Sequence, residues 1–146
     1  HFAISIGLQS YDEIISGLIF DPIKNEMFYG DKNNGSYLNN KRIRVSKKKN
    51  LEECLFATNG KKYKNINLST RKTGSAALDM AYVAAGRYDG YFQENLNLWD
   101  IAAGIIIINE AGGIINSIDL KKNKSIEVLA SSSNINEKML KKLHNF

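Results

Sequence analysis

The stretch NLWDIAAGIIIINEAGG, residues 97–113, decides how the second half of this chain folds. Polar residues and Trp99 come first, an apolar run follows, and Gly112 and Gly113 close the stretch. Glycine commonly follows the last turn of a helix, so the pattern predicts a buried helix that begins near Ile101 and ends at the two glycines. Asp100 then lies at the polar end of an otherwise apolar helix.

Two roles explain a carboxylate at this position. Asp100 can be an N-cap, because an aspartate before the first turn accepts hydrogen bonds from free backbone N–H groups. It can also be a ligand for a hard cation such as Mg²⁺, since a carboxylate fixed at a helix N-terminus and backed by Trp99 stays ionised. The two roles are compatible, and the residue type does not choose between them.

The neighbouring segments predict alternating helices and strands. Residues 74–90 favour a helix with Ala77, Met80, Ala81 and Ala84 on one face and Gly86 at its end. The other elements expected in this half are strands at residues 53–58, 88–93, 113–119 and 126–131 and an amphipathic helix within residues 134–146, with Asn134 or Asn136 near its N-cap. Residues 47–146 therefore form a layered α/β unit.

The first 46 residues have a different pattern. Phe2, Ile4, Ile6 and Leu8 alternate with small or polar residues, which predicts a half-buried strand. A second strand at 13–22 and short strands within 24–46, separated by Gly/Asn turns, complete an antiparallel meander. The fold class is α/β (α+β), in one domain over residues 1–146.

Composition limits the class of protein. A hydrophobic fraction of 43% is ordinary for a globular domain, and a single cysteine excludes an internal disulfide and fits a reducing compartment. No apolar run approaches the roughly 20 residues that cross a bilayer, so a cytoplasmic protein with no membrane association is expected. The net charge of +5 permits nucleic-acid binding, but the lysine clusters lie in polar connections and fit solvated surface better.

Two further segments contain residues suited to binding a ligand. In TGSAA, residues 73–77, a Gly-Ser pair opens a helix and could bind an anion through free N–H groups and a hydroxyl, or simply cap the helix. Arg71 and Lys72 precede it and add positive charge. Gln93 and Glu94 end a short strand before Asp100, where either could hydrogen-bond a polyhydroxylated ligand or have no function.

Together these segments resemble a known family. GSAALDMAYVAAGRYDGYF followed by LWDIAAGIIIINEAGG resembles the inositol monophosphatase family, the Mg²⁺-dependent, lithium-sensitive sugar phosphatases, and the WD-x-AAG…EAGG part is similar to that family's C-terminal signature. The similarity extends over essentially the whole chain, through HFAISIGL, the segment from GLIFDPIKNEMF to KRIRVS, and LFAT. Bacterial members of the extragenic-suppressor type are the most similar. The resemblance implies an αβαβα sandwich with residues 1–46 in its first sheet.

The resemblance also implies roles for individual residues. Asp100 matches the aspartate that binds the catalytic metal and contacts the substrate beside the phosphate. Substrate contacts are implied for Arg71, Gly74, Ser75, Ala76 and Gln93. Gln93 stands where many members have a glutamate that binds an inositol hydroxyl, and Leu98 stands where many have proline.

Two departures from the family pattern concern missing segments. The family's main metal-binding motif, Asp-Pro-Ile/Leu-Asp-Gly-Thr, and a metal-binding glutamate lie upstream of the strand that matches residues 1–8, and neither occurs in this sequence. The chain is therefore expected to lack an N-terminal part and, as written, to be inactive. The connection at residues 59–74 is shorter than usual by about a helix, with residues expected to be missing between about 60 and 66.

The function implied is hydrolysis of inositol monophosphate or a similar small polyol phosphate by a Mg²⁺-activated water. One alternative is a related phosphatase acting on fructose 1,6-bisphosphate, a nucleotide 3′-phosphate or histidinol phosphate. Another, of a different class, is a partner in transcription antitermination and ribosomal RNA processing, a role of some bacterial relatives. Family members are commonly homodimers, so a homodimer is expected.

Overall fold

The computed structural model describes residues 2–146 and shows a mixed α/β fold built on two five-stranded sheets. The first sheet is an antiparallel meander in chain order, as predicted. Its strands are β1 (Ile4–Ser10), β2 (Glu13–Asp21), β3 (Glu26–Asp31), β4 (Gly35–Leu38) and β5 (Lys41–Arg42).

The second sheet has the order β7-β6-β8-β10-β9, with parallel pairs at β7-β6 and β6-β8 and antiparallel pairs beyond. Its strands are β6 (Phe56–Ala57), β7 (Thr70–Arg71), β8 (Gly90–Leu96), β9 (Gly113–Ile115) and β10 (Ile126–Ser132). The helices are α1 (Ala76–Ala84), α2 (Leu98–Glu110) and α3 (Asn136–His144), with a short 3₁₀ helix, η1, at Leu51–Glu53.

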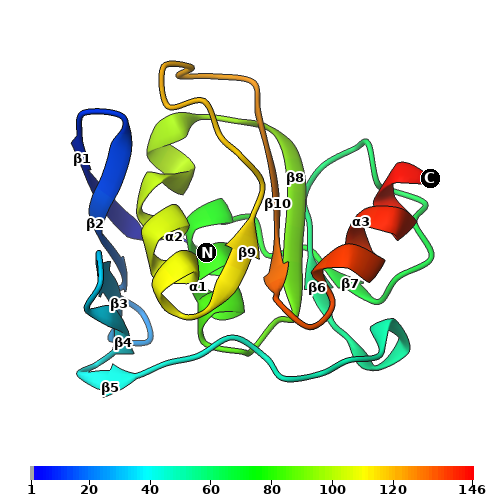
Figure 1. Ribbon diagram of the computed structural model, residues 1–146, viewed down its shortest axis with the longest axis horizontal. Coiled ribbons are helices and arrows are strands. Elements are labelled where there is room, and N and C mark those ends of the chain that lie inside the picture. The colour runs from blue at the N-terminus through cyan, green and yellow to red at the C-terminus, as the bar shows by residue number, and fades with distance from the viewer. Residues whose placement is uncertain (1) are drawn as a thin grey trace.

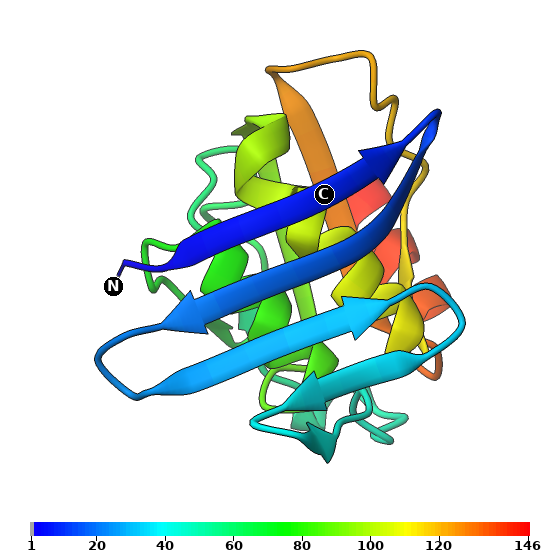
Figure 2. The ribbon, with the colours of Figure 1, turned by 90° about the vertical axis from the view of Figure 1, so that its left-hand side faces the viewer.

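These elements stack in four layers (Figure 1): the first sheet, the pair α1 and α2, the second sheet, and α3 on the far side. They correspond to four of the five layers of the expected αβαβα sandwich. Figure 2 shows the outer face of the first sheet, and none of the elements within residues 2–146 covers it.

The central helix α2 lies very close to the first sheet. A Cβ atom added at Gly17 of β2 would lie 2.6 Å from the carbonyl oxygen of Ala103, a distance that real Cβ atoms do not show. Residue 17 must therefore be glycine for α2 to lie where it does. This contact sets the position of α2 and hence of Asp100 in its first turn.

The first helix is buried on all sides, which differs from the single apolar face predicted. Residues Ala77 to Ala84 are all buried, because α1 packs against α2 in its own layer, against β2 on one side and against β8 and β10 on the other. Gly86 follows with a φ of +70°, a conformation that ends helices and favours glycine, as expected. One of the buried residues is charged: Asp79 is fully enclosed.

The prediction for the first strand was right about the strand and wrong about its buried face. Phe2, Ile4, Ile6 and Leu8 are all exposed, each by more than half of its surface. The opposite, small-residue face packs on α2, where a Cβ at Gly7 would lie 2.8 Å from the Ala102 Cβ. Alternation therefore predicted the strand, while the close approach of α2 selected the small residues for the side that faces the helix, where Ser5 is half-buried and no residue of β1 is fully buried.

Several element ends also differ from expectation. The strands at 53–58 and 113–119 are shorter, as β6 and β9, while β8 runs on to Leu96. Asn134 and Asn136 flank the N-cap position of α3, Ile135, as expected, but neither side chain caps the helix: their amides donate to the Lys47 carbonyl and the Ser131 hydroxyl. Within residues 2–146, every helix is too short or too polar to cross a bilayer.

Candidate active site

A cavity of about 450 Å³ lies where the N-terminal ends of α1 and α2 meet strands of both sheets. Five of the six residues expected to form the site line it. They are Gly74, Ser75, Ala76, Gln93 and Asp100. The cavity also contacts residues that the sequence did not single out, among them Ala3 and Ser5 of the first sheet segment, Asn59 and Leu96. Segments up to 97 residues apart in the chain thus meet at one place.

Asp100 does not cap α2, which corrects the first of its two predicted roles. The helix begins at Leu98 with Asn97 at the N-cap position, so Asp100 lies inside the first turn. Its Oδ2 accepts a hydrogen bond from the Asn97 amide at 3.2 Å, and its Oδ1 has no partner within residues 2–146. The Oδ1 atom is therefore free to bind a cation or a ligand hydroxyl.

Trp99 does not stand behind Asp100 as expected. Trp99 is 59% exposed and is one of the residues that line the cavity. Asn97, rather than the indole, fixes the orientation of the carboxylate.

Ser75 is the N-cap of α1, as one of its two predicted roles required. Its Oγ accepts the backbone N–H of Leu78 at 3.3 Å, which leaves the hydroxyl proton for another acceptor. Gly74 has a φ of +88°, and a Cβ there would meet nothing within 4 Å. The backbone conformation, not a lack of space, therefore favours glycine at this position.

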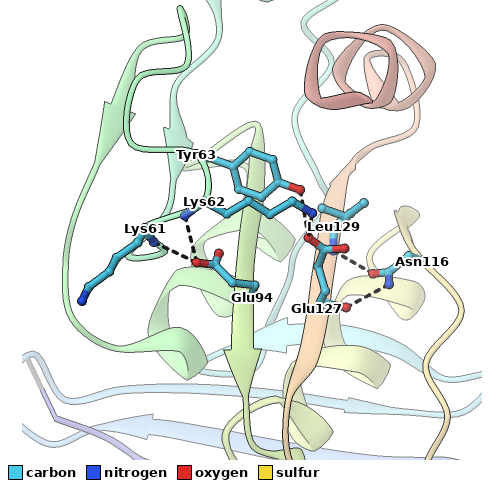
Figure 3. Close-up of polar contacts among 7 residues, drawn as sticks. All are labelled: Lys61, Lys62, Tyr63, Glu94, Asn116, Glu127 and Leu129. Atoms are coloured by element: carbon cyan, nitrogen blue, oxygen red, sulfur yellow. Dashed lines mark hydrogen bonds and ion pairs between the residues drawn. The ribbon is translucent and has the colours of Figure 1, made fainter. Parts of the chain in front are cut away.

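Gln93 and Glu94 lie inside β8 and have different surroundings. Gln93 lines the cavity. Glu94 points away from it and accepts hydrogen bonds from the backbone N–H groups of Lys61 and Lys62, at 2.8 and 3.0 Å (Figure 3). Of the two predicted alternatives, only Gln93 is placed to touch a ligand in this cavity.

A second carboxylate holds the same loop (Figure 3). Glu127 of β10 accepts hydrogen bonds from the Lys62 ammonium at 2.6 Å and the Tyr63 hydroxyl at 2.9 Å. The Asn116 side chain bonds the backbone of Glu127 and Leu129 beside it. The irregular segment after β6 is thus anchored to β8 and β10 by side chains rather than by secondary structure.

Arg71 is exposed on β7 and does not line the cavity. Its guanidinium donates to the carbonyl of its neighbour Thr70. The structure therefore does not bring this residue together with the other five, and its substrate contact stays a prediction.

A hydrogen-bonded network that the sequence did not reveal lies behind the cavity wall. Asn59 accepts from the Gly74 N–H and donates to Asp79 Oδ2, each at 3.2 Å. Thr73 donates its hydroxyl proton to Asp79 Oδ1 at 2.5 Å. Burial raises the pKa of Asp79 to about 6, and the bonds from Thr73 and Asn59 offset part of that rise. Both oxygens of Asp79 are thus bound within the protein, as in a structural role.

The cavity provides only part of a metal-binding site among the described residues. Within residues 2–146, no group of three or more His, Cys, Asp or Glu side chains is placed to hold an ion. The free oxygen of Asp100 has the hard-ligand chemistry that Mg²⁺ prefers, and Mg²⁺ usually keeps several waters besides one or two carboxylates. The described residues therefore fit Mg²⁺ through Asp100 and offer no second acidic ligand beside it.

Comparison with known proteins decides the family. The model of the inositol monophosphatase family matches residues 1–146. The chain belongs to this family. The match confirms the resemblance seen in residues 74–92 and 98–113 and covers the whole chain.

Individual relatives agree. An inositol-1-monophosphatase of Caulobacter vibrioides is 36% identical, over 98% of this chain and 64% of its own length. A protein named Nus factor SuhB from Haemophilus influenzae is 35% identical, over 98% of the chain and 60% of its length. The crystal structure of extragenic suppressor protein suhB from Bartonella henselae superposes with a TM-score of 0.90 at 35% identity, over 98% of this chain and 61% of that one. The chain thus spans about three fifths of the length of these relatives.

Proposed function

We propose that the protein is a Mg²⁺-dependent phosphoric monoester hydrolase that acts on inositol monophosphate or a similar small polyol phosphate. The observation that carries the proposal is the convergence of Asp100, Ser75 and Gln93 on one cavity. These are positions at which the family resemblance implies metal and substrate contacts. The relatives named inositol-1-monophosphatase support the reaction class.

Each residue then has a task set by its geometry. Asp100 would hold Mg²⁺ through its free Oδ1, with Asn97 fixing the other oxygen. A bound Mg²⁺ supplies charge neutralisation of the phosphate and a lowered pKa of bound water. The Ser75 hydroxyl and the Gln93 amide would orient the polyol, and Gly74 and Ala76 would shape the wall around it.

Phosphate release by the full-length protein from a substrate panel tests this proposal. The panel is inositol 1-phosphate, fructose 1,6-bisphosphate, a nucleotide 3′-phosphate and histidinol phosphate, with Mg²⁺ and then with excess chelator. We expect release from inositol 1-phosphate that stops on chelation and returns with Mg²⁺. Release that is insensitive to the chelator contradicts the metal role, and a different preferred ester selects one of the related phosphatases.

The second candidate is a role as a partner of the transcription machinery. It rests on the relatives named Nus factor SuhB, in Haemophilus influenzae and Pasteurella multocida among others. Asp100→Asn separates the two functions: loss of phosphate release with cellular growth functions retained would favour the partner role. Homodimer formation and a cytoplasmic location stay predictions.

A further inference from the structure

The side chain of Gln93 can present either a hydrogen-bond acceptor or a donor to the cavity. Its amide carries an oxygen that accepts and an NH₂ group that donates, and the two ends have nearly the same shape. Which end faces a ligand must be decided from the neighbours. At Gln93 the neighbours decide it.

Two donors face the same oxygen. The backbone N–H of Asn59 lies 3.2 Å from Gln93 Oε1, and a backbone N–H can only donate. The Tyr91 hydroxyl lies 2.9 Å from the same atom. Tyr91 is fully buried, and because burial raises the pKa of its hydroxyl, it keeps the proton that it donates. The amide oxygen is therefore turned toward the protein.

The NH₂ end is left for the cavity. Within residues 2–146, Nε2 of Gln93 makes no hydrogen bond, and it is not among the enclosed polar atoms without a partner. Since Gln93 lines the cavity, its two N–H donors are available to a ligand there. The Ser75 hydroxyl proton is a further free donor on the same cavity wall.

Rotation of the amide is opposed by the way in which Asn59 is held. Its side chain is bonded on one side to the Gly74 N–H and on the other to Asp79. The next residues of the same loop are bonded to Glu94 (Figure 3). A rotated amide would point NH₂ at the Asn59 N–H and leave two donors facing each other, and the loop cannot move away to relieve this.

We infer that Gln93 is a fixed hydrogen-bond donor and that this cavity selects ligands whose group at that wall accepts hydrogen bonds. Anionic oxygens are the strongest such acceptors, so a polyol phosphate with a second phosphate is favoured over one with a hydroxyl there. A glutamate at this position would only accept and would favour the hydroxyl. The inference rests on the proposed function for the identity of the ligand, but not for the orientation of the amide.

Two ligands that differ by one anionic group test the selection. Myo-inositol 1-phosphate and myo-inositol 1,4-bisphosphate are compared by kcat/KM on three forms of the full-length protein: the wild type, Gln93→Met and Gln93→Glu. Gln93→Met is the matched control for charge, because it keeps the length and neutrality of the side chain while removing the donor, together with the oxygen that accepts from Asn59 and Tyr91. We expect the bisphosphate-to-monophosphate ratio to fall about tenfold in Gln93→Met, the size of one hydrogen bond to a charged group, and further in Gln93→Glu. An unchanged ratio in Gln93→Met overturns the inference.

A second measurement decides the orientation without any turnover. In the free protein, NMR should detect a coupling across the hydrogen bond between the Asn59 backbone ¹⁵N and the Gln93 side-chain ¹³Cδ, and its absence overturns the fixed orientation. If the wild-type protein releases no phosphate, the proposed function fails. The two dissociation constants are then measured by calorimetry in the same three proteins, and their ratio replaces the ratio of kcat/KM. If neither ligand binds, the selection is contradicted.

Discussion

The N-terminal turns of α1 and α2 each contain an aspartate, and the two aspartates have opposite surroundings. Asp79 in α1 is fully buried, and both of its oxygens accept hydrogen bonds, from Thr73 and Asn59. Asp100 in α2 faces a cavity, and one of its oxygens has no partner among residues 2–146. The same residue type in the same part of a helix is thus part of the scaffold in one case and available to a ligand in the other. What differs is the set of neighbouring polar side chains: Asn59 and Thr73 bond both oxygens of Asp79, whereas Asn97 bonds one oxygen of Asp100.

The largest expected effect comes from removing the free carboxylate. We expect Asp100→Asn to lower kcat/KM for the best phosphate ester by about 10³-fold, equal to about 4 kcal/mol of transition-state stabilisation, because a neutral amide is a poor Mg²⁺ ligand. The free energy of unfolding should change by less than about 0.5 kcal/mol. Steady-state kinetics and urea denaturation check the two values. Asp79→Asn is the matched control. An equal loss of activity in that variant would contradict the proposal that Asp100 binds the ligand and Asp79 does not.

The buried aspartate, Asp79, should make the stability of the fold depend on pH. The pKa of Asp79 is raised from its ordinary value of 3.8 to about 6, so the folded chain binds this proton more tightly than the unfolded chain. Its contribution therefore destabilises the fold as the pH rises through about 4 to 6. Relative to Asp79→Asn, the wild-type protein should lose about 2 kcal/mol of unfolding free energy between pH 4 and pH 7. Denaturation at several pH values measures the difference, and parallel curves would refute it.

Truncation of the same residue should break the network behind the cavity. We expect Asp79→Ala to lower the free energy of unfolding by about 2 kcal/mol at pH 5, where the carboxyl is mostly protonated, because Thr73 and Asn59 lose their partner. Asp79→Asn should be milder, since an amide can serve both neighbours. Chemical denaturation compares them. Equal losses in the two variants would show that the hydrogen bonds do not matter.

The smallest expected effect compares the two helix caps. Ser75 accepts a backbone N–H of α1, whereas the Asn97 side chain makes no such bond in α2. Ser75→Ala should therefore lower the free energy of unfolding by about 1 kcal/mol, and Asn97→Ala by less than about 0.5 kcal/mol. Asn97→Ala should instead weaken activity a few-fold, because it frees the second oxygen of Asp100. A reversed order of stabilities would contradict the assignment of the two caps.

The parts of the fold that depend on residues close together in the sequence could be predicted from the sequence. The meander of residues 1–46 followed from turn residues and alternation, and the ends of α1 and α2 followed from Gly86 and Gly112, whose φ angles are +70° and +84°. The grouping of Gly74, Ser75, Ala76, Gln93 and Asp100 followed from the family resemblance. The predictions that failed concerned the surroundings of a side chain. Asp100 was expected to cap α2, Trp99 to support Asp100, and the apolar side of β1 to be its buried side.

Asn59 shows why the remainder could not be predicted. It lies in a polar, irregular stretch, and its partners Gly74, Asp79 and Gln93 are 15 to 34 residues away. No periodic pattern links such positions. The distinction between Gln93 and Glu94 is of the same kind, because it depends on where residues 59–62 lie across β8.

The sequence by itself determined the family, the strands and helices, and a set of polar residues at the ends of buried elements, because these depend on local backbone preference and on the spacing of apolar residues. The tertiary structure alone decided which oxygen of which carboxylate is free and which end of the Gln93 amide meets the cavity. Those properties depend on hydrogen-bond partners and burial contributed by distant segments, and they exist only once the two sheets enclose α1 and α2.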